Sequence, residues 1–174
     1  MDGLVIEVGD LLGVPGSHTD VSVTGPIEGL RGALGWVDED DPVEVVVTVE
    51  SLADGLAVTG AATGNLHLVC SRCLTEFNMT FEQRIDEAYY LEKAEERGGY
   101  EVAGAMLDLE PMLRDVIVLG IPVRPLHSLD CKGLCPECGT DRNTQDCGHS
   151  SRAGDIRWAP LADLAAELKE GREQ

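Results

Sequence analysis

The first half of the chain alternates apolar and polar residues, and the alternation is clearest from position 43 onward. Four valines occupy every second position of residues 43–49, and Glu44, Thr48 and Glu50 fall on the opposite face. A period of two residues is typical of a strand with one buried and one exposed face. The sequence therefore predicts that the main sheet begins at Val43.

Shorter runs on both sides of this segment predict further strands. They cover residues 4–8, 21–24, 56–62, 66–70 and 77–81. Asp54-Gly55 has the composition of a tight hairpin turn, and short connections favour antiparallel pairing of consecutive strands. We therefore expect an antiparallel meander in which the segment around Cys70 forms the tip of the last hairpin.

Helical spacing occurs in the second half of the chain. Apolar residues recur every three or four positions from Leu109 to Val116, Asp108 precedes them as a helix cap, and Pro111 falls in the first turn. This pattern predicts an amphipathic helix that packs on the sheet and ends at Gly120.

A second apolar stripe predicts a C-terminal helix from Pro160 to about residue 170, which is expected to pack on the core or to dock on a partner. Residues 25–42 and 92–105 lack sustained periodicity and are expected to be loops. Within the first of them, Trp36 is expected to cap the core.

These elements predict one α+β domain, since 174 residues is the length of a single domain. The expected architecture is an antiparallel sheet of about five to seven strands that could curl toward a barrel, with one packed helix and a pair of zinc knuckles. Residues 1–126 would form the sheet and helix, residues 127–152 a cysteine-rich zinc segment, and residues 153–174 the C-terminal helix.

Charge adds a strong acidic bias, because the formal net charge is −19. Residues 1–69 alone contain twelve acids and one base, for a net −11. Such a segment repels a phosphate backbone, which argues against non-specific nucleic-acid binding by this half of the chain. It favours a surface for a basic partner instead, and its densest run of acids is Asp38, Glu39, Asp40 and Asp41. The candidate contacts to RNA are bases close to cysteines, namely Arg72, Lys132 and Arg142.

The six cysteines carry the clearest chemical signal. Two C-x2-C pairs, Cys70 with Cys73 and Cys135 with Cys138, predict a tetrahedral four-thiolate Zn²⁺ site, although the usual gap between such pairs is only about 15 to 20 residues. Gly139 after the second pair can adopt the left-handed conformation of a zinc knuckle. Four thiolates leave no open coordination position, so the site should be structural rather than catalytic.

The ligand set has alternatives within the same segment. A purely local set would combine the second pair with Cys131 and Cys147, and His127 or His149 could each replace a sulfur. We favour the two-pair set because a metal that closes a long loop adds most to the stability of a small fold.

Other cysteine chemistries fit less well. A disulfide framework requires a secreted chain, and the acidic N-terminus lacks the basic and apolar regions of a signal peptide. A redox pair normally opens a helix in a thioredoxin-like setting, and six unrelated thiols would not fall in pairs. We therefore expect a reducing, cytoplasmic location, and no run approaches the about 18 apolar residues of a membrane helix.

Catalytic motifs are not evident in the sequence. None of the four histidines, His18, His67, His127 and His149, forms a metalloprotease pair or accompanies a nucleophilic serine. No glycine-rich loop leads to a lysine at the start of a helix, so nucleotide binding is unsupported. A hydrolase that binds Mg²⁺ through clustered acids is the weakest of the alternatives that we retain.

Three segments resemble the YceD family of large ribosomal RNA subunit accumulation proteins. They are VCSRCLTEF, IPVRPLHSLDCKGLCPECGTDRN and RWAPLADLAAEL, and the second is the most specific. The resemblance implies a non-catalytic ribosome biogenesis factor that promotes accumulation or assembly of large-subunit ribosomal RNA. Its partner would be that RNA or a precursor of the large subunit, contacted through the bases near the cysteines. The alternative is an acidic chaperone for one basic ribosomal protein, which would need the acids of residues 38–41.

Overall fold

The computed structural model describes residues 3–92, 94–149 and 161. The chain divides into two compact units, Met1–Leu129 and Asp130–Gln174, and each is described by itself. The predicted C-terminal helix falls outside the described residues, except for Leu161. No helix among the described residues is long and apolar enough to cross a membrane.

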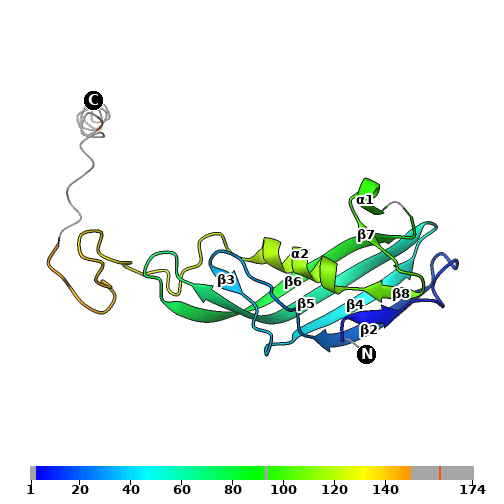
Figure 1. Cartoon of the computed structure of the whole chain (residues 1–174), viewed down its shortest axis with the longest axis horizontal. Helices are drawn as coiled ribbons and strands as arrows, with labels where there is room; N and C mark the ends of the chain where they lie inside the picture. The colour runs from blue at the N-terminus through cyan, green and yellow to red at the C-terminus, as the bar shows by residue number, and fades with distance from the viewer. Residues whose placement is uncertain (1–2, 93, 150–160, 162–174) are drawn as a thin grey trace, which may run out of the picture. The chain divides into compact units, whose positions relative to one another are not determined.

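The first unit is built on a six-stranded sheet (Figure 1). Its strands are β2 (His18–Gly25), β3 (Gly35–Trp36), β4 (Val43–Ser51), β5 (Gly55–Val69), β6 (Glu76–Tyr90) and β7 (Tyr100–Glu101). The spatial order is β2-β4-β5-β6-β7, and β3 pairs with β5 beyond the end of β4. All pairs are antiparallel except β6 with β7, so the sheet is mixed and the expectation of a purely antiparallel sheet is wrong at this edge.

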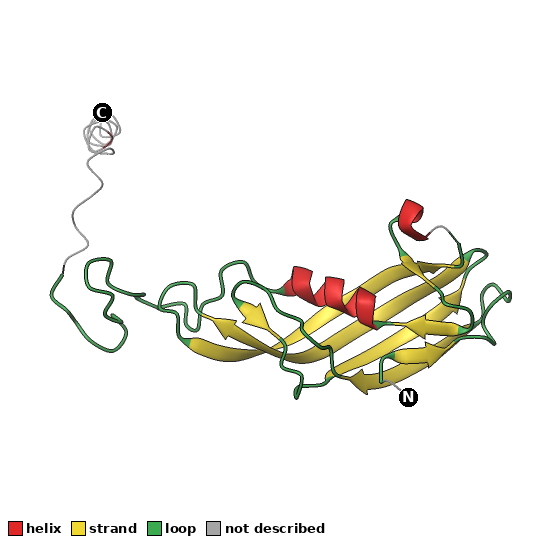
Figure 2. Cartoon of the chain, viewed as in Figure 1, coloured by secondary structure: helices red, strands yellow, loops and turns green. Residues whose placement is uncertain are grey.

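The sheet is open, so the barrel-like alternative is wrong. β2 lies at one edge and β7 at the other, and these two strands do not pair. The apolar face of the sheet is buried instead by helix α2 (Glu110–Gly120), which lies across the sheet in Figure 2, and by a separate pair of strands, β1 (Val5–Glu7) and β8 (Met106–Asp108). Because these elements cover the core, closure of the sheet is not needed to remove it from water.

Helix α2 confirms the predicted amphipathic helix but begins differently at its N-terminus. Leu109, not Asp108, occupies the cap position, and no side chain caps the helix there. The Asp108 carboxylate instead accepts the backbone N–H of Glu110 at 2.9 Å. The buried face of the helix consists of Met112, Leu113 and Ile117.

The two expected loops contain short elements. Residues 25–42 include β3, whose Trp36 is half-buried and stacks on His67 of β5 with 5.5 Å between ring centroids. Residues 92–105 include β7 and a short helix, α1 (Ala94–Arg97). Edge pairing with β5 and β6 orders these segments without any periodicity of their own.

β5 and β6 form one hairpin of 15 residues on each side. The sequence predicts two strands, 56–62 and 66–70, where the structure has one continuous strand, β5. Gly64 lies inside the strand, and a Cβ there would come within 2.8 Å of the Phe81 ring. Val69 pairs with Glu76, which confirms that the segment around Cys70 is a hairpin tip.

Candidate metal centres

The hairpin tip of the first unit is a compact knuckle, Cys70–Thr75. The Cys70 N–H donates to the Thr75 carbonyl and the Leu74 N–H donates to the Cys70 carbonyl, each at 2.9 Å. Leu74 has a φ of 62°, in the left-handed region that side chains other than glycine rarely adopt. This tight turn places both cysteine side chains of the pair on the same side of the knuckle.

The second unit contains the same knuckle at Cys135–Thr140. The Cys135 N–H donates to the Thr140 carbonyl and the Gly139 N–H donates to the Cys135 carbonyl, each at 2.8 Å. Gly139 has a φ of 73°, which confirms the predicted left-handed conformation. The position held by Leu74 in the first knuckle is therefore held by a glycine here, where the conformation costs less.

A threonine follows each C-x2-C pair at the same position and was not predicted as part of the site. The Thr75 hydroxyl lies 3.2 Å from Cys73 Sγ, and the Thr140 hydroxyl lies 3.2 Å from Cys138 Sγ. Each hydroxyl can donate to a thiolate, as outer-shell groups of metal sites commonly do. Aligning the two knuckles with each other would have shown the shared pattern C-x2-C-x-T.

The knuckles belong to two separate groups of ligand atoms. Cys70 and Cys73 are grouped with His127 and Cys131, and the ligand atoms of this group all lie within 4.8 Å of one another. Within the first unit, Cys73 Sγ is 3.3 Å from His127 Nδ1, and the Ser71 N–H donates to the Pro125 carbonyl at 2.8 Å. That backbone bond holds the segment before His127 against the hairpin tip.

The second group is contained in the second unit. It comprises Cys135, Cys138, Cys147 and His149, again with all ligand atoms within 4.8 Å of one another. Cys135 Sγ is 3.8 Å from His149 Nδ1. The Gly148 N–H donates to the Asp146 carboxylate at 2.9 Å, which shapes the turn between the last two ligand residues.

The structure divides the favoured ligand set. Cys70 and Cys73 belong to one group and Cys135 and Cys138 to the other, while the alternates Cys131, Cys147, His127 and His149 complete the two groups. The spacings C-x2-C and H-x3-C are short-range and visible in the sequence, but which pair joins which histidine depends on the fold. The residues that bind metal remain a prediction.

The donors of both groups suit zinc. Tetrahedral zinc with Zn–S bonds of about 2.3 Å holds its sulfurs about 3.8 Å apart, so ligand atoms within 4.8 Å need only small inward shifts. Three cysteines and one histidine form a common structural zinc set and leave no coordination position for water. Both groups could therefore hold a closed, non-catalytic ion.

The local hydrogen bonds favour thiolates at two of the cysteines. Burial raises the pKa of Cys70, but hydrogen bonds from His127 and from backbone N–H groups outweigh it and lower the pKa to about 5. Hydrogen bonds from the Thr140 side chain and backbone lower the pKa of Cys138 to about 6. The His149 N–H lowers the pKa of Cys147, yet the neighbouring Cys135 sulfur and burial raise it more. Thiolates are the metal-binding form of cysteine.

The candidate partner-binding residues lie on the surface. Arg72 is exposed in the first knuckle, Lys132 is exposed in the second unit, and Arg142 is half-buried there. In the acidic loop 38–41, the first three acids are exposed. Asp41 Oδ2 lies 2.9 Å from His67 Nε2, which holds one end of the loop against β5.

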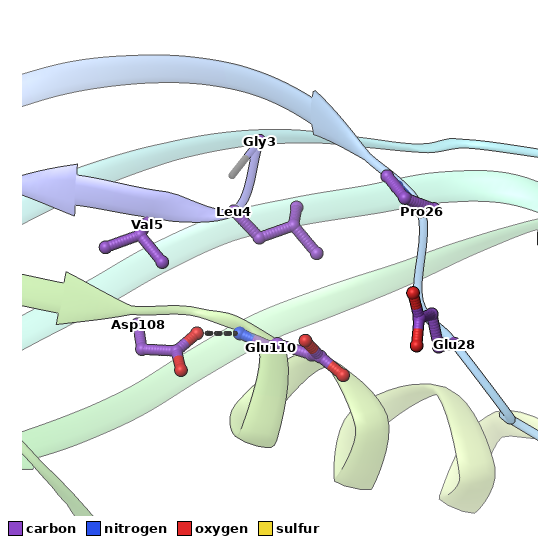
Figure 3. Close-up of a pocket in the computed structure, with 7 residues that line it drawn as sticks. All are labelled: Gly3, Leu4, Val5, Pro26, Glu28, Asp108 and Glu110. Atoms are coloured by element: carbon purple, nitrogen blue, oxygen red, sulfur yellow. Dashed lines mark hydrogen bonds between the residues drawn. The ribbon is translucent and has the colours of Figure 1, made fainter. Parts of the chain in front are cut away.

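A cleft of about 440 Å³ gathers three acids near the start of α2, as Figure 3 shows. Asp108 accepts the Glu110 N–H, and the Glu110 carboxylate accepts from Arg114 at 2.7 Å. Arg114 also donates to the backbone carbonyl of Glu28 at 2.7 Å. Asp108 and Glu110 thus start and brace the helix, and this arrangement gives a hydrolase mechanism no support.

Comparisons with known proteins agree with these features. The family model described as "Large ribosomal RNA subunit accumulation protein YceD" matches residues 58–165. The Arabidopsis thaliana protein "Large ribosomal RNA subunit accumulation protein YCED homolog 1, chloroplastic" is 27% identical over 64 residues, which cover 37% of this chain and 20% of that protein. No solved structure gives a significant match.

Mycobacterial proteins match over a longer stretch. An uncharacterized protein of Mycobacterium leprae is 33% identical over 132 residues, covering 72% of this chain and 60% of the relative. An uncharacterized protein of Mycobacterium bovis is 29% identical over 134 residues, covering 74% and 64%. The chain thus spans less than two thirds of the length of these relatives. Since the family model covers well over half of the chain, including both metal-ligand groups, the chain belongs to the YceD family.

Proposed function

We propose that this protein is a non-catalytic ribosome biogenesis factor that promotes the accumulation or assembly of large-subunit ribosomal RNA. The observation that carries the proposal is the YceD family match over residues 58–165, which includes both knuckles and all but the first three residues of the long hairpin. The description of the family names the large ribosomal RNA subunit.

Zinc in this proposal is structural. One ion would be held by Cys70, Cys73, His127 and Cys131, and a second by Cys135, Cys138, Cys147 and His149. Closed coordination supports an architectural role for both ions, because catalytic zinc normally keeps a position open for water or substrate. A metal at the first group fastens the segment before His127 to the hairpin tip.

Depletion in cells that carry this protein tests the proposed function. We expect depletion to lower the amount of mature large subunits relative to small subunits, measured as peak areas in sucrose-gradient profiles. Wild-type protein expressed in trans should restore the ratio. A depletion that slows growth and leaves the subunit ratio unchanged would contradict the proposal.

Two contacts with the assembling particle are compatible with this role. RNA would be contacted through Arg72, Lys132 and Arg142, whose neutralisation should weaken RNA binding and lower its salt dependence by about one unit per lost phosphate contact. A basic ribosomal protein would be contacted through acids, beginning with the exposed residues 38–40. The charge of the first unit favours the second contact.

A further inference from the structure

The side of the main sheet opposite α2 presents a continuous set of side chains, here called the outer face. The strand register aligns these residues in rows across β2, β4, β5 and β6. The rows are His18-Glu50-Ala57-Ala88, Asp20-Thr48-Thr59-Asp86, Ser22-Val46-Ala61-Arg84 and Thr24-Glu44-Thr63-Glu82.

The side chains of the outer face are accessible to solvent. None of the residues in its rows is buried, whereas the residues that alternate with them on β4, Val43, Val45, Val47 and Val49, are all buried. At its centre Val46 is 54% exposed and lies opposite Ala61. In the part of the chain that the structure describes, this face is therefore uncovered, and small side chains such as Ser22 and Ala61 flank the exposed valine at its centre.

The charge of the outer face is predominantly negative. Its rows contain five carboxylates, on Asp20, Glu44, Glu50, Glu82 and Asp86, and one arginine, Arg84. Arg84 lies 3.3 Å from Asp86, and both side chains are largely exposed, so this pair neutralises little beyond itself. Asp20 accepts the Thr48 hydroxyl at 2.6 Å, which orients its carboxylate on the face.

The acidic loop 38–41 adjoins this face. His67 follows the outer-face residues Thr63 and Asn65 at the same two-residue spacing along β5, and its ring is in contact with Asp41 at 2.9 Å. Through Asp41, the acidic loop is therefore anchored to the same strand that carries part of the outer face.

We propose that the outer face is a docking surface for a lysine- and arginine-rich segment of a protein. The inference rests on the proposed function, because it names the class of partner met during large-subunit assembly. Charge complementarity selects this occupant, since a row of carboxylates attracts cationic side chains and repels phosphate. A second copy of the same face would bring like charges together. The small residues and Val46 allow a flat backbone or the stems of long basic side chains to lie against the sheet.

Binding of a model peptide by the full chain provides the test. The probe is a fluorescent peptide of about ten residues that alternates lysine or arginine with valine or alanine, long enough when extended, at about 33 Å, to cross four strands. Fluorescence anisotropy gives its Kd for wild type and two variants. The face variant is Asp20→Asn, Glu44→Gln, Glu50→Gln and Glu82→Gln. The control variant, with the same change in charge, is Glu7→Gln, Asp10→Asn, Glu95→Gln and Glu101→Gln, all exposed positions outside the face.

We expect the face variant to bind the peptide about tenfold or more weakly than wild type, because several exposed ion pairs of modest strength are lost together. The control variant should stay within about threefold of wild type, reflecting its lower net charge alone. Circular dichroism should show that both variants retain the sheet. Single-stranded RNA of the same length should bind the face variant as well as wild type or better.

Equal losses in the two variants would overturn the inference, because net charge and not the outer face would then govern binding. Weaker RNA binding by the face variant would also overturn it and assign the face to nucleic acid. A dimer in light scattering that the face variant abolishes would assign the face to a second copy. These outcomes are separate from the depletion experiment, whose failure would remove the ribosomal role and leave the peptide result standing.

Discussion

Leu74 and Gly139 occupy the same position in the two knuckles with almost the same backbone conformation, at φ 62° and 73°. Leu74 gains little from its side chain in return, because it is 59% exposed. A left-handed conformation costs a residue with a side chain about 1 to 2 kcal/mol, which glycine avoids. The first knuckle therefore holds a small strain that the second knuckle does not.

Substitutions at these two positions test this difference in strain. Leu74→Gly should raise the free energy of unfolding by about 0.5 kcal/mol, since relief of strain exceeds the added freedom of the unfolded chain. Gly139→Ala should lower the stability of the second knuckle by about 1 kcal/mol. A Cβ at Gly139 would meet no atom within 4 Å, so the backbone conformation alone is responsible. Thermal unfolding at fixed zinc concentration measures both, and a destabilised Leu74→Gly would contradict the argument.

At the residue scale the sequence predicts ligand types better than ligand partners. The C-x2-C pairs and the left-handed Gly139 are local features, and both are found in the structure. The grouping of Cys70 with His127, across 57 positions, depends on where α2 and the segment after it return the chain. Nothing in the local spacing encodes that return, and the favoured set paired the knuckles with each other.

At the element scale the two knuckles should load metal separately. Wild-type protein purified without chelator should contain about two zinc ions per chain, and Cys73→Ser and Cys138→Ser should each retain about one, since each removes a ligand from a different group. The double variant should retain none. Elemental analysis with a protein concentration from amino-acid analysis gives the ratios.

The four-cysteine set favoured by the sequence, Cys70, Cys73, Cys135 and Cys138, predicts a different zinc content for the wild type and the variants. One zinc per wild-type chain, lost completely in either single variant, would restore that set and exclude two separate sites. Ser71→Ala serves as the matched control, because its side chain lies in the same turn while only its backbone N–H is bonded to Pro125.

The sequence predicts the elements that have an apolar face of their own and misses those that are ordered by pairing with another strand. The valine alternation of β4 and the stripe of α2 were predicted because each element carries its own apolar face. β3 and β7 have two residues each and are ordered by pairing with β5 and β6, which no local pattern reveals. The continuity of β5 through Gly64 was not predicted, because the Phe81 ring that packs against this glycine belongs to the other strand.

For the whole molecule, the hydrophobic core and the second metal-ligand group lie in different units. Every residue of the core cluster belongs to the first unit, and the described part of the second unit, residues 130–149, contributes none. A segment without a core of its own usually depends on a disulfide or a metal for order. The second unit should therefore depend on its metal more strongly than the first.

Hydrogen exchange with and without a zinc chelator tests this difference. Chelation should speed exchange across residues 130–149 and at the knuckle amides of Cys70 and Leu74, because metal binding supplies their stability. The amides of β4 should exchange as slowly as before. Uniformly faster exchange throughout both units would contradict the idea that the core stabilises the sheet while the metal stabilises residues 130–149. Unchanged exchange everywhere would exclude a structural role for zinc.

The open sheet was the feature of the whole molecule that the sequence left undecided. Alternation along each strand is the same in a barrel and in an open sheet, because both bury one face. The cover supplied by α2 and the β1–β8 pair decides between them, and no apolar pattern in the sequence predicts β8, which directly follows residues 92–105.

The length of the β5–β6 hairpin affects how reliably its two strands pair in the correct register. Its 15 pairs fix one register from Gly55 and Tyr90 to Val69 and Glu76, and a slip by one residue would turn every side chain to the opposite face. In the observed register, Cys70 and Cys73 at the hairpin tip lie beside His127. Metal binding at the tip would then favour the native register of the whole sheet. In cells short of zinc, more of the newly made protein would fail to reach the native fold.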